Sequence, residues 1–215
     1  ERVRKTVGDD FPLWCKLDSI EYGKTDGITL TDAIEAARLS EKAGVDAITV
    51  SAYHDANRGA LHSESNIPHV PNRMVSNAAA INHSLSIPVI ASGRIEPESA
   101  EKDIASGRYD FFGMGRKMLA DPDLPNKLHA GTPADIRPCI YCYCCVSQVD
   151  VSKQIKCAVN PDAGFEKERE LITSDSPRHV AVVGGGPAGM EVARRLSLRG
   201  FRVSLIESGK RLGGT

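Results

Sequence analysis

The segment Pro88-Val89-Ile90-Ala91-Ser92-Gly93-Arg94 decides how the first half of this 215-residue chain folds. A short apolar run ends in glycine and arginine, and one helix later the segment Asp110-Phe111-Phe112-Gly113-Met114-Gly115-Arg116 repeats the arrangement. Either pair alone would be interpreted as a turn with a surface arginine. At the ends of successive strands, however, glycine lets backbone N–H groups approach an anion and arginine adds bidentate charge. The two loops together predict a phosphate-binding site.

Outward from these segments, strands and helices alternate through the first 130 residues. Thr29 and Asp32 form a predicted capping box at the start of a helix that ends at Gly44. Alternating units of this length form a parallel sheet, either a (β/α)8 barrel or a doubly wound sheet. Barrels place a phosphate site after strands seven and eight, which favours the barrel. The other expected elements are strands Phe11–Leu17, Ala47–Ser51, 88–92 and 110–113, and helices Asn72–His83 and Pro97–Ser106.

Composition excludes several function classes. The chain is 41% hydrophobic with a formal charge of -1, as expected for an ordinary α/β domain with a core. Its few aromatic residues are not interleaved with basic runs, so nucleic acid is not an expected partner. The sequence has neither a signal-peptide pattern nor an apolar run long enough to span a bilayer. We expect a cytoplasmic protein that acts on a small molecule, with homo-oligomers left open.

Five of the six cysteines lie within residues 139–157. Three of them form a C-x2-C-x2-C run, and a fourth follows after eleven residues. Thiolates are ligands that iron and zinc both accept. Disulfides are disfavoured because nothing indicates an oxidising compartment, and a structural zinc usually takes two C-x2-C pairs. The tight triple with one distant partner therefore favours a cubane iron–sulfur cluster, with zinc as the alternative. The predicted ligands are Cys139, Cys142, Cys145 and Cys157.

Two cysteines are left over by this assignment. Cys144 is a surplus thiol, because the even spacing from Cys142 leads to Cys145. Cys15 stands alone in an apolar run and is interpreted as a core residue.

The C-terminal stretch, from His179 onward, has a glycine-rich strand–loop–helix–strand pattern. The expected order is a strand at His179–Val183, the loop Gly184–Gly189, a helix at Met190–Arg199 and a strand at Arg202–Ile206. An acidic residue, Glu207, follows the last strand, eighteen positions past the third glycine. This is the βαβ pattern of dinucleotide-binding domains, in which the helix N-terminus receives the pyrophosphate and the acid receives the ribose hydroxyls. The alternative is a glycine-rich turn that merely packs helix on strand. The predicted contacts are Gly184, Gly186, Ala188, Gly189, Glu207 and Gly214.

With these motifs established, the chain resembles the iron–sulfur flavoenzymes related to old yellow enzyme, which include 2,4-dienoyl-CoA reductase, 2-enoate reductase and trimethylamine dehydrogenase. The resemblance spans nearly the whole chain. It implies an FMN in the barrel, a [4Fe-4S] cluster after it, an FAD or other ADP-type nucleotide in the C-terminal domain, and NAD(P)H as electron donor. Its most specific segments are Ile87–Ile95, Met114–Arg116, Leu119–Pro125, Asp135–Cys142, Cys157–Pro161 and Gly184–Gly189.

The resemblance also implies roles for individual residues. Lys16 falls where the family usually has an arginine facing the flavin pyrimidine, and lysine keeps the cation but loses the planar fork. His54 falls where dienoyl-CoA reductase has an active-site histidine after a barrel strand, so it is the expected proton donor or orienting group. A solvated loop histidine is the alternative. The implied FMN contacts are Gly93, Arg94, Gly115 and Arg116.

The function implied by the resemblance is NAD(P)H-dependent reduction of an activated C=C bond in an enoate or dienoyl-CoA, with electrons passing through FAD, [4Fe-4S] and FMN. The C-x2-C-x2-C spacing matches the amine dehydrogenases instead, so amine oxidation stays an alternative. A non-catalytic, zinc-stapled nucleotide-binding or interaction segment is the alternative of another class. Against this family we expect an internal fragment, inactive alone. It would comprise the C-terminal half of an FMN-binding (β/α)8 TIM barrel (1–131), a [4Fe-4S] cluster segment (132–173) and the start of a Rossmann domain for FAD or NAD(P) (174–215).

Overall fold

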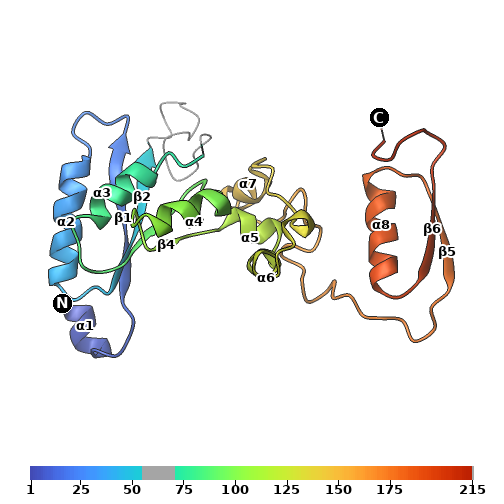
Figure 1. Ribbon diagram of the computed structural model, residues 1–215, viewed down its shortest axis with the longest axis horizontal. Helices are drawn as coiled ribbons and strands as arrows, with labels where there is room; N and C mark the ends of the chain where they lie inside the picture. Colours follow the sequence, from blue (N-terminus) through green and yellow to red (C-terminus); the bar gives the residue numbers. More distant parts are fainter. Residues whose placement is uncertain (55–70, 215) are drawn as a thin grey trace. The chain divides into compact units, whose positions relative to one another are not determined.

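The computed structural model describes residues 1–54 and 71–214, and the chain divides into two compact units, Glu1–Met118 and Leu119–Thr215 (Figure 1). The first unit alternates helices and strands, and α5 (Arg116–Ala120) crosses its boundary. Its elements are α1 (Arg2–Val7), β1 (Trp14–Tyr22), α2 (Leu30–Lys42), β2 (Ala47–His54), α3 (Val75–Asn82), β3 (Val89–Ala91), α4 (Pro97–Ala105) and β4 (Phe111–Phe112).

The strands of the first unit form one parallel sheet in the order β1-β2-β3-β4. The predicted α/β class with a parallel sheet is therefore confirmed. One row of Cα partners runs Lys16, Thr49, Ile90 and Phe111, and the next runs Leu17, Val50, Ala91 and Phe112. Because side chains alternate along a strand, these two rows lie on opposite faces of the sheet.

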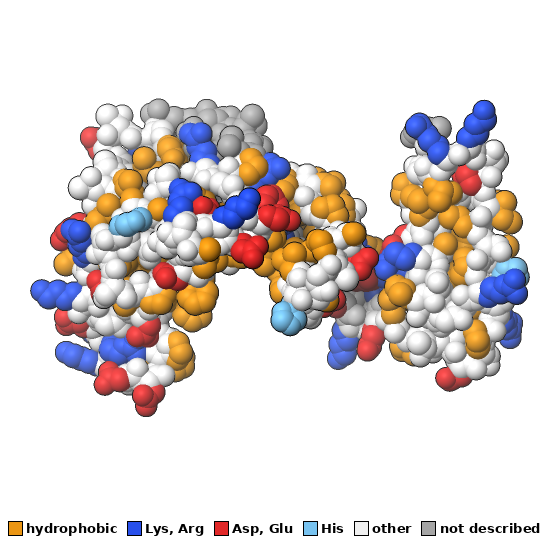
Figure 2. Space-filling view, viewed as in Figure 1, with side chains coloured by type: hydrophobic (Ala, Val, Ile, Leu, Met, Phe, Trp, Pro, Cys, Tyr) orange, Lys and Arg blue, Asp and Glu red, His pale blue; other side chains and the backbone are white. Residues whose placement is uncertain are grey.

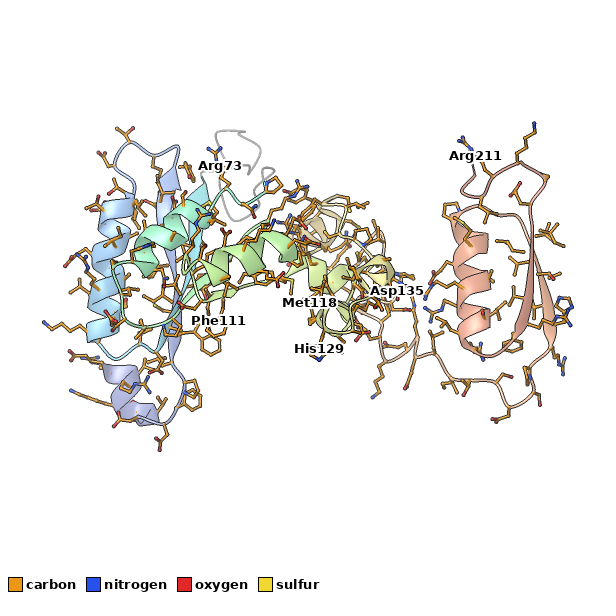
Figure 3. All side chains as sticks on the ribbon, viewed as in Figure 1. Arg73, Phe111, Met118, His129, Asp135 and Arg211 are labelled. Carbon is orange, nitrogen blue, oxygen red and sulfur yellow. The ribbon has the colours of Figure 1, made fainter. Side chains whose placement is uncertain are left out.

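The core lies between the sheet and helices α2 and α3, which pack against β1 and β3. The helices contribute mainly alanines, which let them approach the strands closely, and Cys15 packs at the margin of this core as predicted. The opposite face is more open: Trp14 is 61% exposed and Phe111, labelled in Figure 3, is 58% exposed. The buried residues at the centre are Ala33, Ala37, Ile48, Val50, Ala78, Ile81, Val89 and Ala91.

The strand boundaries differ from those expected. The predicted ends of the first two strands, Leu17 and Ser51, are wrong, because pairing of β1 with β2 continues to Tyr22 and His54 after a register shift. The polar residues beyond the apolar runs are accommodated by hydrogen bonds: Ser19 Oγ donates to Ser51 O at 2.7 Å and Ser51 Oγ donates to Asp18 Oδ1 at 2.5 Å. Hydrogen-bonded hydroxyls can be buried without the cost of an unsatisfied polar group.

Helix α3 begins later than predicted. Asn72 has a φ of 62°, a left-handed conformation that cannot start a right-handed helix, and its backbone N–H donates to Arg94 O at 2.8 Å. The helix therefore begins at Val75, three residues past its predicted start.

The capping box of α2 is present as predicted. Asp32 N donates to Thr29 Oγ1 at 3.3 Å, and Thr29 N donates to Asp32 Oδ2 at 2.9 Å. The Thr29 hydrogen bonds lower the pKa of Asp32 below its usual range.

Replacing Thr29 by alanine is expected to lower the free energy of unfolding by about 1 kcal/mol, because the substitution removes the acceptor for one of the free N–H groups at the helix start. Urea denaturation of the variant measures the loss. Thr31→Ala, at an exposed position in the same first turn, is the matched control and should leave stability nearly unchanged. An equal loss in both variants would contradict a capping role.

The second unit contains a separate two-stranded parallel sheet, in which β5 pairs with β6 and α8 packs on both strands. Helix α8 begins three residues before the predicted Met190, because Pro187 supplies a preset helical φ at its first position. Among the residues that the structure describes, no helix is long and apolar enough to cross a membrane. The elements of this unit are α6 (Leu124–His129), a 3-10 turn (Pro133–Asp135), α7 (Cys144–Asp150), β5 (His179–Val183), α8 (Pro187–Leu198) and β6 (Arg202–Ile206).

Candidate functional site

The two glycine–arginine loops lie side by side at the carboxyl edge of the first sheet. They directly follow the neighbouring strands β3 and β4, and Gly113 N donates to Ala91 O at 2.8 Å. Gly93 has a φ of 121°, which L side chains rarely adopt, and a Cβ at Gly115 would meet nothing within 4 Å. The backbone at Gly115 is therefore open to a ligand.

The arginines of these loops are both half-buried. Residues next to both arginines hold the loops in place. Ser92 Oγ donates to Val50 O at 2.5 Å, and Lys117 Nζ forms an ion pair with Glu96 Oε2 at 2.5 Å. The structure thus brings Arg94 and Arg116 to one edge of the sheet, as the sequence predicted. Two guanidinium groups on anchored loops suit a phosphate dianion.

Lys16 is exposed in the first half of β1, where its Cα partner is Thr49. Its neighbours Cys15 and Leu17 pack against the core, so the strand alternation places Lys16 on the open face of the sheet. His54 is the last residue of β2, within the strand rather than in the loop expected after it. Its side chain lies outside the described part of the structure, so its predicted role stays a prediction.

The cysteine segment begins in an irregular loop and continues into α7, which starts at Cys144. Tyr141 and Tyr143 turn the loop sharply, with left-handed φ values of 52° and 59°. Tyr141 N donates to Cys139 Sγ at 3.4 Å, the kind of amide contact that stabilises a thiolate. All six cysteines are free thiols.

Burial differs among the predicted cluster ligands. Burial is the largest cause raising the pKa of Cys145, and the neighbouring Cys139 and Cys157 thiols raise it further. Cys142 is exposed. Across residues 1–54 and 71–214, no three His, Cys, Asp or Glu side chains are arranged to hold a metal ion. The described structure therefore does not gather the predicted cluster ligands into a metal-binding arrangement.

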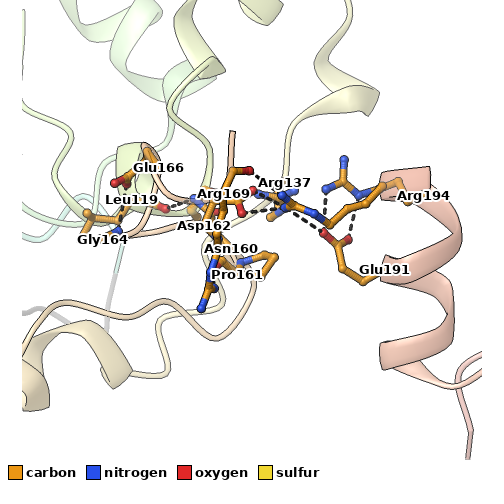
Figure 4. A network of polar contacts seen from close by, with 12 residues as sticks. Leu119, Arg137, Asn160, Pro161, Asp162, Gly164, Glu166, Arg169, Glu191 and Arg194 are labelled. Carbon is orange, nitrogen blue, oxygen red and sulfur yellow. Dashed lines mark hydrogen bonds and ion pairs between the residues drawn. The ribbon is translucent and has the colours of Figure 1, made fainter. Parts of the chain in front are cut away.

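Two buried polar residues anchor the segments on either side of the cysteine cluster segment. Asn160 is 3% exposed, its Nδ2 donates to Leu119 O at 2.8 Å (Figure 4), and its Oδ1 accepts from Asp162 N at 3.1 Å. Asp121, also 3% exposed, pairs with Lys127 Nζ at 2.7 Å and accepts from Arg137 N at 2.7 Å. Sequence reasoning assigned no role to Asn160 or Asp121, although both lie in segments that carry the family resemblance.

The nucleotide loop requires glycine at its contact with the helix. A Cβ at Gly189 would lie 1.9 Å from Gly184 O, whereas a Cβ at Gly186 would meet nothing within 4 Å. Gly186 is the N-cap of α8, and no side chain caps the helix there. Ala188 lies in the first turn of the helix. An open loop leading into an uncapped helix N-terminus is a suitable cradle for a pyrophosphate.

Glu207 lies at the end of β6, opposite this loop. Its Oε1 accepts from Gly209 N and its Oε2 accepts from Gly185 N, both at 2.6 Å. These backbone hydrogen bonds, from Gly209 first and then Gly185, lower the pKa of Glu207. Gly213 N donates to Gly185 O at 2.8 Å, which brings the segment containing Gly214 against the loop. The predicted nucleotide contacts are therefore gathered at one end of the β5–β6 sheet.

Comparison with known proteins identifies the family of the chain. Residues 1–135 match the model of the NADH:flavin oxidoreductase / NADH oxidase family, and residues 182–215 match an NAD(P)-binding Rossmann-like domain. The chain therefore belongs to the NADH:flavin oxidoreductase / NADH oxidase family, and its predicted resemblance to these flavoenzymes is confirmed.

Individual relatives include both reductases and amine dehydrogenases. A metal reductase of Desulforamulus reducens is 37% identical over 99% of this chain and 31% of its own length. A dimethylamine dehydrogenase of a Hyphomicrobium species is 33% identical over 100% of this chain and 30% of its own. The solved structure of a 2-naphthoyl-CoA reductase is 31% identical, with a TM-score of 0.85 over 98% of this chain and 32% of that one. The chain thus spans about a third of the length of these relatives.

Proposed function

We propose that this chain contributes the FMN phosphate site, the cluster ligands and the nucleotide loop of an NAD(P)H-dependent oxidoreductase that reduces an activated C=C bond. The observation that carries the proposal is the pair of anchored glycine–arginine loops on the neighbouring strands β3 and β4. The open nucleotide loop at Gly184–Gly189 supports it from the second unit. Family membership supports the redox class.

The chain supplies candidate residues for each predicted group, although the described structure does not gather the cysteines into a metal-binding arrangement. Arg94 and Arg116 would hold the FMN phosphate, and Lys16 would place a positive charge on the open face of the sheet. The backbone of Gly184–Gly189 would hold the pyrophosphate of FAD or a related nucleotide, next to the carboxylate of Glu207. When bound, these groups would supply hydride and single-electron transfer from NAD(P)H through FAD and a [4Fe-4S] cluster to FMN. The proposed cluster ligands are Cys139, Cys142, Cys145 and Cys157.

The chain's own polar residues would bind and orient the substrate. We propose His54, at the carboxyl end of β2, as the group that donates or positions a proton at the substrate carbon. An unsaturated acid or acyl-CoA fits the proposal, because an enoate or thioester carbonyl makes the C=C bond electron-poor. Oxidation of NADH or NADPH by an enoate and by a dienoyl-CoA, and reduction of an added electron acceptor by a tertiary amine, measured in the complete enzyme purified without oxygen, test it. Amine-dependent reduction of the acceptor, without NAD(P)H oxidation by either unsaturated substrate, would contradict the reductase assignment.

One specific observation favours a second candidate, amine oxidation. Two residues separate Cys142 from Cys145, as in the amine dehydrogenases that the chain resembles. The amine in the same assay distinguishes the two reactions.

Arg116→Ala is expected to weaken FMN binding about tenfold or more, because it removes a charge-assisted contact worth roughly 1.5–3 kcal/mol. The dissociation constant of FMN, measured by fluorescence recovery in the complete enzyme, reports the change. Arg38→Ala, on the exposed surface of α2, is the control and should bind FMN normally. Unchanged FMN affinity in Arg116→Ala would refute the phosphate assignment.

A further inference from the structure

Asn72 has an unusual backbone conformation beside the first glycine–arginine loop. Its φ of 62° lies in the left-handed region, which residues other than glycine, asparagine and aspartate rarely adopt. Its neighbour Arg73 is labelled in Figure 3. A non-glycine residue stays in this conformation only where the surrounding structure holds it there. The contacts of Asn72 therefore indicate what the conformation serves.

The backbone of Asn72 is bonded to the arginine of that loop. Asn72 N donates to Arg94 O at 2.8 Å, although the two residues are far apart in the sequence. The angle φ is the rotation about the N–Cα bond, so it sets the direction of the N–H group relative to the chain that continues into α3. Because α3 packs against β3, the left-handed value directs this N–H group at the loop.

The side chain of Asn72 holds the other end of the same loop. Asn72 Nδ2 donates to Ser99 Oγ at 3.2 Å, and the Ser99 hydroxyl donates to Glu96 O at 3.0 Å. Ile95, which lies between the two bonded carbonyls, is 2% exposed. Asn72 thus fixes the carbonyl of Arg94 directly and that of Glu96 through Ser99, on either side of a buried side chain.

The same network continues to the second glycine–arginine loop. Glu96 Oε2 pairs with Lys117 Nζ at 2.5 Å, with side chains that are 40% and 11% exposed. Lys117 directly follows Arg116 in the sequence. The backbone segments that carry the two arginines are therefore tied to each other, and Asn72 is bonded to this frame at two points.

We propose that Asn72 is a positioning residue for the FMN phosphate, because it fixes the Gly93–Arg94 loop before the phosphate binds. This inference rests on the proposed function, which places the phosphate at Arg94 and Arg116. Binding is stronger when the groups that contact a ligand are already ordered, since less conformational freedom is lost. Loss of the Asn72 contacts should therefore weaken binding of the phosphate group and not of the flavin ring.

The first test needs no flavin. In the complete enzyme with its flavin removed, Asn72→Ala should raise the hydrogen-exchange rate of the backbone amides of residues 93–96 about tenfold, because alanine disfavours the left-handed turn and cannot bond to Ser99. Asn72→Gly adopts this φ without strain and should raise the rate less. The control is Asn82→Ala, at the far end of α3, where Asn82 Nδ2 donates to Gly107 O at 3.2 Å. Unchanged exchange in Asn72→Ala would overturn the anchoring.

The second test compares FMN with riboflavin, which has the same ring and ribityl chain but no phosphate. In the flavin-free complete enzyme, Asn72→Ala should raise the dissociation constant of FMN about tenfold and leave that of riboflavin unchanged. Asn72→Gly and Ser99→Ala should each raise the FMN constant about threefold, because they lose the side-chain bond and keep the bond from residue 72 N to Arg94 O. Asn82→Ala should change neither constant.

The ratio of the two dissociation constants decides the outcome. An unchanged ratio in Asn72→Ala and Asn72→Gly, whether both constants stay or both rise, would overturn the positioning role, because general loosening of the fold affects both flavins alike. Asn72→Gly and Ser99→Ala decide the test if Asn72→Ala fails to fold.

The wild-type enzyme separates this inference from the proposed function. If it binds riboflavin as tightly as FMN, the phosphate assignment and the role of Asn72 fall together. If the wild type prefers FMN and the Asn72 variants keep that preference in full, the inference is overturned and the proposed function stands.

Discussion

Cys157→Ser is expected to eliminate the iron–sulfur cluster, so that iron and sulfide fall from about four of each per chain to near zero. Cys157 is the only predicted ligand outside the C-x2-C-x2-C run. Serine removes the soft thiolate that iron requires, and the three remaining cysteines cannot complete four-fold ligation of a cubane cluster. Iron and sulfide analysis of protein purified without oxygen, together with its visible absorbance, measures the loss.

Two other cysteines provide matched controls. Cys144→Ser replaces the surplus thiol at the start of α7, and Cys15→Ser replaces a thiol that packs beside the core of the first unit. Both variants should keep a full complement of iron. Loss of iron in Cys144→Ser with retention in Cys157→Ser would reassign the ligands. Stoichiometric zinc in the wild type, with neither iron nor sulfide, would favour the zinc-stapled alternative.

Gly189→Ala is expected to weaken nucleotide binding about a hundredfold and to destabilise the second unit by roughly 1–3 kcal/mol. The added Cβ would lie 1.9 Å from Gly184 O. That atom belongs to the backbone, so the loop or α8 must shift. Both the close packing of helix on strand and the presentation of the loop amides depend on this contact. Calorimetric titration with FAD and ADP measures affinity, and thermal unfolding measures stability.

Gly186→Ala separates nucleotide binding from packing. Its Cβ would meet nothing within 4 Å, and its φ of -70° suits any residue. The variant should therefore unfold like the wild type, yet bind nucleotide more weakly if the pyrophosphate approaches Gly186. If the loop serves only to pack α8 on β5, Gly186→Ala will leave nucleotide affinity unchanged. That result would contradict the proposed nucleotide site.

Much of the architecture could be read from local patterns. The strands at Ala47, Val89 and Phe111 lie in apolar runs bounded by polar or glycine residues, and such runs form strands with at least one apolar face against a core. The capping box at Thr29 and Asp32 is a short-range motif whose partners are three residues apart. The predicted α/β class, the parallel sheets and the two glycine–arginine loops therefore agree with the structure.

Charged side chains on the face shown in Figure 2 do not form a patch of one sign. On the face shown in Figure 2, lysine and arginine side chains are interspersed with aspartate and glutamate. Buried charged residues, which form ion pairs and hydrogen bonds inside the fold, say more about how the chain is held together. Asp121, for example, is buried, and although burial raises the pKa of its carboxyl, bonding to Lys127 and to the Arg137 amide more than offsets this and leaves the pKa lowered.

Local sequence determined the type and order of the helices and strands and the position of the glycine-rich nucleotide loop, because each of these patterns depends on residues a few positions apart. The hydrogen-bonded ion pair of Arg195 and Asp162 joins residues 33 positions apart and has no local signature. The extension of β1 to Tyr22 likewise depends on hydrogen bonds with β2, and the anchoring of the Cys157 loop depends on Leu119. Only the tertiary structure decided these features, because a hydrogen bond between distant residues forms only after packing has brought its donor and acceptor together.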